Sequence, residues 1–369
     1  MAADRNIGKY IEFLRFCLHE EAEIPECVSD MNWHALLAFA RKQSIVGTCW
    51  EGVSRLSDIA NKPTEDDILE WMSIVGTIRK RNRQTDKVAA WTTENFRKEG
   101  FETCLLKGQG AALLYPDPLL RMPGDVDVWV RPEGGQKEKE VIAYVRRFCP
   151  KSKACYHHID FVSKENIPIE VHYRPQWMNS PIHNHRLQKF FAQEADRQFN
   201  HTAELPNGSG SISVPTVRFN IVFMLAHVYN HLLHEGIGFR QLIDYYYLLR
   251  NRPATDKETN WADLFRKLGL KSFARAVMWL MQSVFGLEEK YLLDKPDKRL
   301  GQLLLNEMTE GGNFGKYDER TLSGTYTSPM AKNVQRILRD IRLMWYFPSE
   351  CLWEPWFRIY HWIWRKRNN

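Results

Sequence analysis

Two aspartates, Asp125 and Asp127, open an apolar and β-branched run of residues. Side chains alternate between the two faces of a strand, so this spacing predicts that both carboxylates share the face of Trp129, while Val126 and the alternate valines point into a core. Two carboxylates this close repel each other unless a cation lies between them. Mg²⁺ is such a cation, because it binds carboxylate oxygens and then substrate phosphates. Taken alone, the pair is also compatible with a solvated strand face.

Two further acidic residues are candidates to complete a metal site. In the run 167–173, Glu170 alternates with apolar residues and is expected to project from the face opposite to them. If this run lies beside the strand of the two aspartates, three carboxylates converge, as a site for two cations requires. Asp160 alternates with apolar neighbours on the preceding run in the same way. The residue pattern by itself leaves both candidates open.

Lys107 and Gly108 lie upstream, where an extended run ends. A glycine at a strand-to-helix turn allows close approach of the backbone to a ligand, and the amides that follow can bind phosphate. The alternative interpretation is a plain glycine turn beside a solvated lysine. Only the downstream carboxylates favour the phosphate-binding interpretation.

Hydrophobic periodicity and turn residues predict the elements that position these side chains. Residues 1 to about 98 have apolar residues at helical spacing, which predicts a helical region. A mixed segment follows, with strands expected at 101–106, from Asp125 onward, at 157–162 and at 167–173, the last two joined by a turn at 163–166, and with helices at 111–115 and 137–148. From Val217 the chain is predicted to be helical again, with loops at 311–315 and 323–329.

The composition is that of a globular protein, with 369 residues, 44% of them hydrophobic and 26% charged. A secretory leader and an apolar stretch of about 18 residues are both absent from the sequence, so a cytoplasmic protein that does not span a membrane is expected. The seven cysteines include no Cys-x-x-Cys pair, which favours reduced thiols. The net charge of +6 comes mainly from residues 331–369, where eight Lys or Arg face three Asp or Glu.

The order of these motifs resembles the bacterial nucleotidyltransferase-like family of the DNA polymerase β-like superfamily. The resemblance covers most of residues 30–360 and rests on Leu105-Leu-Lys-Gly108, on Gly-Asp-Val-Asp-Val-Trp-Val and on Ile169-Glu-Val-His-Tyr173. It continues through Ala226-His-Val-Tyr-Asn-His231 and Gly236-Ile-Gly-Phe-Arg-Gln-Leu-Ile-Asp244, and Gly311-Gly-Asn-Phe-Gly315 would be a third signature. One departure is the Lys-Gly turn, where the superfamily commonly has Gly-Ser.

The resemblance implies an α+β fold in three parts. These are an N-terminal helical region at 1–84, a small mixed-sheet nucleotidyltransferase core at 85–200 and a C-terminal helical domain at 201–369. It also implies a metal-dependent enzyme that moves a nucleoside monophosphate from a nucleoside triphosphate to an acceptor and releases pyrophosphate. The acceptor is left open among small molecules, RNA, proteins and polysaccharide precursors.

The resemblance also assigns residues. Asp125, Asp127 and Glu170, here ranked above Asp160, would be the catalytic residues that hold two Mg²⁺ ions, or Mn²⁺. The nucleotide-binding residues would be Lys107, Gly108, Gln109, Arg121, His227, Arg240 and Asp244. Lys107 and Arg121 would neutralise the leaving pyrophosphate, and Gly108 and Gln109 would contribute backbone amides. His227, Arg240 and Asp244 would either face the nucleotide or brace the two halves of the protein.

The histidines carry less specific signals. His227 and His231 are four residues apart on a predicted helix, but no glutamate follows His227 as a zinc-protease motif demands, so zinc is not expected there. His172, next to Glu170, is a candidate to orient that carboxylate. The pair at 157–158 and the run 183–185 are expected to be solvated surface.

The C-terminal segment 356–367 combines aromatic residues with a basic cluster. Such a segment suits a weak contact with a membrane surface or with nucleic acid, or a last helix that packs on the bundle and ends in cations, and packing is the favoured interpretation. Two other functions stay open. A catalytically silent protein would use this segment to bind nucleic acid or a partner, and a phosphohydrolase would use the same carboxylates.

Overall fold

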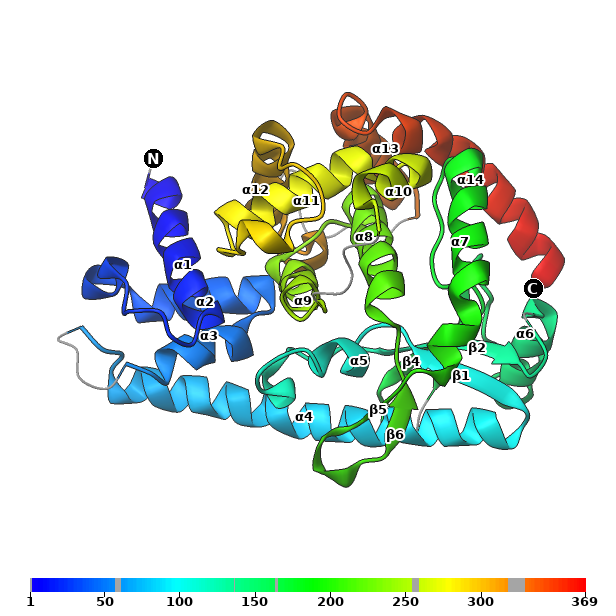
Figure 1. Cartoon of the computed structure of the whole chain (residues 1–369), viewed down its shortest axis with the longest axis horizontal. Helices are drawn as coiled ribbons and strands as arrows, with labels where there is room; N and C mark the ends of the chain where they lie inside the picture. Colours follow the sequence, from blue (N-terminus) through cyan, green and yellow to red (C-terminus); the bar gives the residue numbers. More distant parts are fainter. Residues whose placement is uncertain (1, 57–60, 136, 163–164, 254–258, 318–328) are drawn as a thin grey trace.

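The fold is α+β, as predicted, with a small mixed sheet surrounded by helices (Figure 1). The computed structural model describes residues 2–56, 61–135, 137–162, 165–253, 259–317 and 329–369. Among these residues, no helix is both long enough and apolar enough to cross a membrane. The turn predicted at 163–166 and the loop predicted at 323–329 fall partly outside the described residues.

The N-terminal part is helical, as predicted. Its helices are α1 (Ala2–Leu18), the 3₁₀ turn η1 (Glu26–Asp30), α2 (Trp33–Gln43), α3 (Val46–Val53) and α4 (Glu65–Lys98). Thr64 and Asp67 form a capping box at the start of α4, in which the side chain of each accepts a hydrogen bond from the backbone amide of the other. This box satisfies amides in the first turn only. The helix continues to Lys98 and so runs through residues 84 and 85, where the sequence suggested a boundary between regions.

Four strands form the central sheet. They are β1 (Phe101–Leu105), β2 (Val126–Pro132), β3 (His158–Val162) and β4 (Pro168–His172), in the order β1-β2-β4-β3. β2 runs parallel to β4, and the two outer pairs are antiparallel. All four strands lie where the sequence predicted them. β2 begins only at Val126, so Asp125 lies in the preceding loop and not within the strand.

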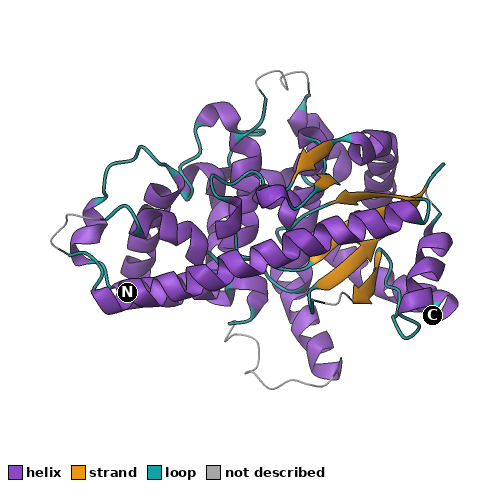
Figure 2. Cartoon of the chain, turned by 90° about the horizontal axis from the view of Figure 1, so that it is seen from below, coloured by secondary structure: helices purple, strands orange, loops and turns teal. Residues whose placement is uncertain are grey.

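The two faces of the sheet have different surroundings. Val126, Val128 and Val130 share a buried apolar cluster with side chains of α4 and of α6 (Glu138–Phe148). On the opposite face, the Trp129 ring lies 4.7 Å from the ring of Phe199 and 5.6 Å from that of Phe219. Figure 2 shows α4 crossing beneath the strands. Asp127 shares the face of Trp129, and this face carries the candidate site.

The remaining elements include α5 (Gln109–Ala112) and η2 (Pro118–Leu120), between β1 and β2. After the sheet come α7 (Pro181–Asn200), β5 (Thr202–Glu204), η3 (Pro206–Gly208), β6 (Ser211–Ser213), α8 (Val217–His234), α9 (Phe239–Arg250), α10 (Trp261–Leu268), α11 (Lys271–Ser283), η4 (Glu289–Tyr291), α12 (Lys298–Gly311), η5 (Asn313–Gly315), α13 (Pro329–Leu343) and α14 (Pro348–Asn368). The C-terminal domain was expected to begin at residue 201 and to be helical from Val217, and α8 does begin at Val217. The β5–β6 hairpin before it was not expected; it forms where Leu205 and Ile212 are buried in the apolar cluster of the sheet.

One side of the last helix, α14, packs against the rest of the protein; the sequence favoured packing on the helical bundle, whereas the C-terminal end of α14 lies on the sheet region. The Trp364 ring stacks 6.2 Å from that of Tyr173, and the Asn369 amide donates to the carbonyl oxygen of Ala154. The other side of α14 leaves Trp356 and Ile359 exposed. Packing therefore accounts for only part of the aromatic content of this segment.

Candidate active site

A cavity of about 640 Å³ opens between the polar face of the sheet and the helices α8 and α9. Its volume is in the range of small-molecule binding sites. Carboxylates, cations and histidines from distant parts of the chain line it. The predicted site residues among its lining are Lys107, Gly108, Arg121, Asp125, Asp127, Glu170, His227, Arg240 and Asp244. Of the predicted set, Gln109 alone is missing from this lining.

The pairing of β2 with β4 brings two of the predicted carboxylates together. Asp127 and Glu170 are direct partners in the parallel register, so both lie on the polar face at adjacent positions. Asp160 is the antiparallel partner of Glu170 on the outer strand β3, but its side chain is 70% exposed and does not line the cavity. The geometry therefore favours Glu170 over Asp160, in agreement with the ranking from the resemblance.

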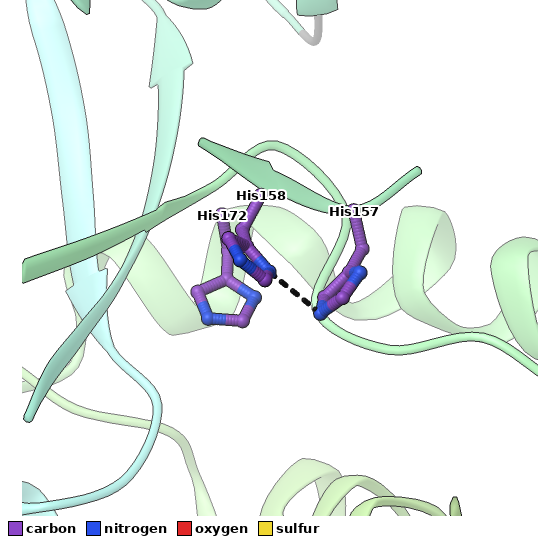
Figure 3. Close-up of side chains that lie close together, drawn as sticks. All are labelled: His157, His158 and His172. Atoms are coloured by element: carbon purple, nitrogen blue, oxygen red, sulfur yellow. Dashed lines mark hydrogen bonds between the residues drawn. The ribbon is translucent and has the colours of Figure 1, made fainter. Parts of the chain in front are cut away.

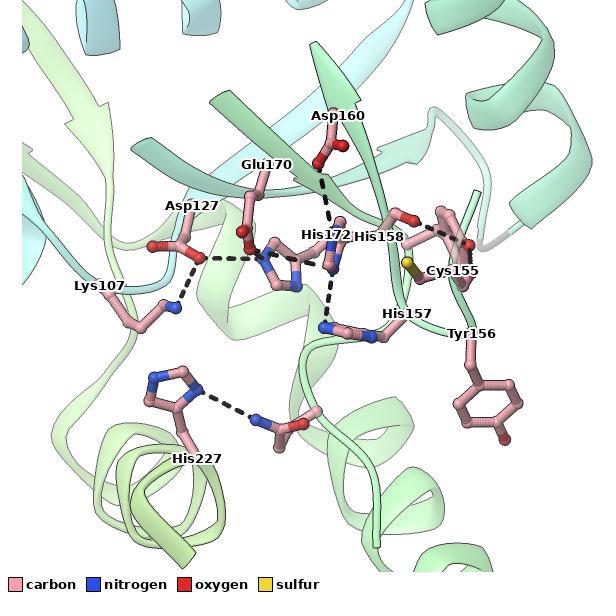
Figure 4. A network of polar contacts seen from close by, with 12 residues as sticks. Lys107, Asp127, Cys155, Tyr156, His157, His158, Asp160, Glu170, His172 and His227 are labelled. Atoms are coloured by element: carbon pink, nitrogen blue, oxygen red, sulfur yellow. Dashed lines mark hydrogen bonds and ion pairs between the residues drawn. The ribbon is translucent and has the colours of Figure 1, made fainter. Parts of the chain in front are cut away.

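Asp127 is almost fully buried and is bound by two basic groups (Figure 4). The Nζ atom of Lys107 lies 2.6 Å from its Oδ1 atom, and Nε2 of His172 lies 3.1 Å from the same oxygen. The same nitrogen of His172 lies 3.3 Å from Oε2 of Glu170. His172 thus bridges the two carboxylates, which is the orienting role suggested for it from the sequence.

These contacts keep both carboxylates ionised. Burial alone would raise the pKa of Asp127, but Lys107 and His172 outweigh it and lower that pKa. Burial also opposes ionisation of Glu170, yet His172, Lys107 and His158 bring its pKa down to about 2. Lys107 is affected in the reverse sense, because burial lowers its pKa while the surrounding carboxylates raise it above its ordinary value. The site is therefore a charged cluster at neutral pH.

Asp125 lies at the same cavity but outside this cluster. Among the described residues, its carboxylate has no hydrogen bond or ion pair, and it is not within the group of mutually close ligand atoms formed by Asp127, Glu170 and His172. Gly108 lies close to the backbone of Asp125. It has a positive φ of 59°, and a Cβ atom placed on it would lie 3.1 Å from the carbonyl oxygen of Asp125. A glycine is therefore required for the Lys-Gly turn to approach the Asp125 loop.

Arg121 and Asp244 form a buried ion pair with each other. Nε of Arg121 lies 2.7 Å from Oδ1 of Asp244, and Nη2 lies 2.8 Å from Oδ2. The hydroxyl of Tyr115 donates to the same Oδ1 atom at 2.7 Å. The pair connects the β1–β2 segment with α9, so it braces two parts of the chain. The phosphate contact predicted for Arg121 and the nucleotide contact predicted for Asp244 stay predictions.

Arg240 has a different environment. Within the described ranges it has no carboxylate partner, and its Nε atom is buried without a hydrogen-bond partner. Its Nη1 donates to the carbonyl oxygen of Met122 at 3.4 Å, and its guanidinium lies 5.5 Å from the centre of the Phe314 ring. Burial and the neighbouring Arg121 lower its pKa. A partly buried cation that lines a cavity and makes no direct carboxylate contact among the described residues is suited to bind an anionic ligand.

Two other predicted nucleotide ligands have described partners of their own. His227 lies between Gln176, 3.1 Å from its Nδ1 atom, and His231, 3.0 Å from its Nε2 atom. Burial lowers its pKa well below 6.5, so the ring is neutral. The side chain of Gln109 is buried and donates to Asp86 on α4. Only the backbone amide of Gln109, at the start of α5, is available for the predicted phosphate contact.

The expectation that His157 and His158 form solvated surface is wrong. Both line the cavity, and the side chain of His158 is only 16% exposed, because β3 pairs with β4 and places His158 directly opposite His172. The predicted turn at 163–166 already contained this signal, since a hairpin centred there pairs position 158 with 171 or 172. In the run 183–185, His183 is bound to Glu350 at 3.0 Å, whereas His185 is exposed as expected.

The carboxylates of the cavity are suited to bind hard divalent cations such as Mg²⁺ and Mn²⁺. Asp127 and Glu170 supply ionised carboxylates side by side, and Asp125 supplies one without a partner among the described residues. Carboxylate oxygens are the preferred ligands of such ions. The positively charged Lys107 is at present the main counter-charge of Asp127.

Comparison with known proteins identifies the family. Residues 29–286 match the model of a family described as uncharacterised nucleotidyltransferase, so the chain belongs to this family. The match includes every predicted site residue and ends before the Gly-Gly-Asn-Phe-Gly segment at 311–315. Searches of curated proteins and of solved structures gave no match.

Proposed function

We propose that the protein is a divalent-cation-dependent nucleotidyltransferase that moves a nucleoside monophosphate from a nucleoside triphosphate to an acceptor and releases pyrophosphate. The observation that carries the proposal is the pairing of Asp127 with Glu170 in a cavity that also holds Arg240, whose guanidinium contacts no carboxylate in the described part of the chain. Family membership supports the class of reaction. The motif order supports placing the family in the bacterial branch of the DNA polymerase β-like superfamily.

In this proposal, Asp125, Asp127 and Glu170 hold Mg²⁺ or Mn²⁺. The bound cation would neutralise charge on the triphosphate and lower the pKa of the acceptor hydroxyl. A carboxylate with a pKa of about 2 is a weak base at neutral pH, so we assign Glu170 to cation binding and not to proton abstraction.

The chain itself supplies the cations that bind the triphosphate. Arg240 offers a guanidinium without a carboxylate partner among the described residues, and Lys107 offers an ammonium that a cation at Asp127 would release from its ion pair. The backbone at Gly108 and Gln109 begins a short helix whose first amides lack intrahelical acceptors. These groups line the same cavity as the carboxylates and would supply the positive charge that a triphosphate needs.

The proposal is tested by incubating the purified chain with each α-labelled nucleoside triphosphate, Mg²⁺ and a cell extract, and then separating labelled RNA, protein and small molecules. We expect label transfer by the wild type and a loss of at least about 100-fold in Asp127→Asn and Glu170→Gln. The matched control is Glu204→Gln, which removes an exposed carboxylate on β5 and should leave transfer unchanged.

Other outcomes would identify the alternatives. Release of nucleoside monophosphate or phosphate without a labelled acceptor would indicate a phosphohydrolase and contradict transfer. Absence of all turnover, together with salt-sensitive RNA binding that survives Asp127→Asn, would indicate a silent binding protein that uses the basic C-terminal segment.

A further inference from the structure

Three histidines that line the cavity stand next to the carboxylate cluster, and the proposed transfer reaction assigns them no chemical step. They are His157, in the loop before β3, His158 on β3 and His172 on β4 (Figure 3). The ring centres are 4.3 Å apart for the first two and 5.3 and 5.4 Å from His172. One nitrogen from each ring lies within 4.8 Å of the others. We propose that these three imidazoles bind one transition-metal dication of the zinc class, at a site distinct from the carboxylate site.

The strongest observation is the state of His172. Its side chain is 4% exposed, and its Nδ1 atom is buried without a hydrogen-bond partner among the described residues. Figure 3 shows this nitrogen on the side of the ring that faces His157. An unsatisfied buried imidazole nitrogen is costly, and metal coordination is one way to satisfy it.

The nitrogens on the far sides of two rings have the partners that zinc-binding histidines have. Nε2 of His172 lies 3.1 Å from Oδ1 of Asp127, and Nε2 of His158 lies 3.5 Å from Oδ1 of Asp160. Metal-bound histidines usually donate their other nitrogen to a carboxylate, which fixes the tautomer and makes the metal-facing nitrogen more basic. In both residues the opposite nitrogen is Nδ1; that of His172 has no hydrogen-bond partner among the described residues, and that of His158 faces His157 and lies 3.9 Å from Oε2 of Glu170. This carboxylate–histidine arrangement occurs twice around the same point.

The third imidazole is that of His157. Nε2 of His157 lies 2.8 Å from Nδ1 of His158, so both nitrogens point at each other in the absence of an ion. Three imidazoles that bind through deprotonated nitrogens select borderline cations such as Zn²⁺, Co²⁺ and Ni²⁺ and not Mg²⁺, which prefers oxygen ligands. Because all three side chains line the cavity, a fourth ligand position would be open to it, as in zinc sites with three protein ligands.

The proposed site would also act on the carboxylate cluster. A metal ion on Nδ1 of His172 requires that its Nε2 atom carry the proton, which then points at Asp127 and Glu170. The ring would be held as a hydrogen-bond donor to both carboxylates. Occupancy of the histidine site would therefore fix the orientation of the side chains at the other site.

The test uses the full chain without an added histidine tag, stripped of metal with a chelator and titrated with Co²⁺ in excess Mg²⁺. We expect one equivalent of Co²⁺ with the visible absorption of a tetrahedral site, displaced by Zn²⁺. His157→Gln should weaken Zn²⁺ binding by about 100-fold in competition with a chromophoric chelator. His185→Gln, at an exposed histidine, is the matched control and should bind like the wild type.

Two further measurements distinguish the histidine site from the carboxylate site. Asp125→Asn should leave Zn²⁺ binding unchanged, and an equal loss in this variant would overturn the distinction between the two sites. In the wild type, added Zn²⁺ should shift the ¹⁵N resonance of the His172 Nδ1 atom, a readout that does not depend on any variant folding. An unshifted resonance, or equal Zn²⁺ affinity in His157→Gln and wild type, would overturn the proposal. None of these measurements needs nucleotide transfer. The conclusion about the histidine site would therefore stand even if the transfer assay failed.

Discussion

Asp244 is the residue through which the β1–β2 segment is attached to α9. Its carboxylate accepts two hydrogen bonds from Arg121 and one from Tyr115, and all three side chains are buried. Both charges can be buried because the two hydrogen bonds between the guanidinium and the carboxylate replace the contacts that each group would make with water. The removal of one partner would leave the other charge buried without a counter-charge.

We therefore expect Asp244→Asn to lower the free energy of unfolding by about 3 to 5 kcal/mol, measured by urea denaturation. The double variant with Arg121→Met and Asp244→Leu should recover part of this loss, because neither buried charge remains. A midpoint for Asp244→Asn equal to that of the wild type would contradict a structural role for the pair.

The backbone at Gly108 supports a second prediction at the residue scale. Gly108→Ala should weaken nucleotide binding about tenfold, measured with a fluorescent triphosphate, because the new Cβ atom presses on the Asp125 carbonyl at 3.1 Å. Gly134→Ala is the matched control, since Gly134 also has a positive φ, of 88°, but no atom within 4 Å of the added Cβ. Both variants should lose about 1 kcal/mol of stability. Equal nucleotide binding by the two would exclude the contact as the cause.

At the scale of elements, α13 and α14 bury acidic groups where they meet. Asp340 on α13 is 6% exposed, and its Oδ1 atom has no hydrogen-bond partner among the described residues. Burial and the nearby Glu354 raise its pKa to about 7, although Arg336, Arg339 and Arg358 oppose the shift. The folded state therefore holds a proton on Asp340 that the unfolded chain releases at lower pH.

This difference predicts how stability depends on pH. Because the folded pKa is above the ordinary value of 3.8, the contribution of Asp340 to stability is complete below that pH and is lost as the pH rises toward about 7. Asp340→Asn should therefore be more stable than the wild type at pH 8 by about 1 to 3 kcal/mol, and the difference should shrink toward pH 4. Thermal unfolding across this range measures it, with the exposed Glu165→Gln as the control for loss of one charge. A difference that does not change with pH would contradict the assignment.

At the scale of the whole molecule, the N-terminal helices and the C-terminal helices share one hydrophobic core. The ring of Phe39 on α2 lies 5.6 Å from that of Phe239 on α9. Gln43, which is fully buried, donates to the carbonyl oxygen of Met308 at 2.8 Å and accepts from the amide of Phe239 at 3.2 Å. Each part of the chain therefore completes the core of the other.

It follows that a fragment of residues 85–369 should fail to fold on its own. Such a fragment cuts α4 in the middle and exposes the apolar surface that α1 and α2 cover. We expect it to bind a hydrophobic dye and to lack the cooperative thermal transition of the full chain. A cooperative transition in the fragment would contradict a shared hydrophobic core and would show that residues 85–369 fold without the N-terminal helices.

Local sequence patterns determined much of this arrangement. The strands at 101–106, 157–162 and 167–173 were predictable because alternation and turn residues are properties of neighbouring positions. The same alternation placed Asp127 and Glu170 on polar faces. Where the local pattern was weak, prediction failed: the short β5–β6 hairpin was missed because its burial depends on the sheet beneath it and not on its own residues.

The tertiary structure decided which side chains meet. Strand order places Asp127 beside Glu170 and brings His157 and His158 to His172. Helix packing places Asp244, and not Arg240, against its partner Arg121. A sequence shows which groups are present and, within a strand, which of them share a face, because both follow from covalent spacing; it did not show that β2 begins only after Asp125. The neighbours of each group are set by contacts between distant segments. These contacts place Asp125, Asp127, His157 and His158 in the lining of one cavity.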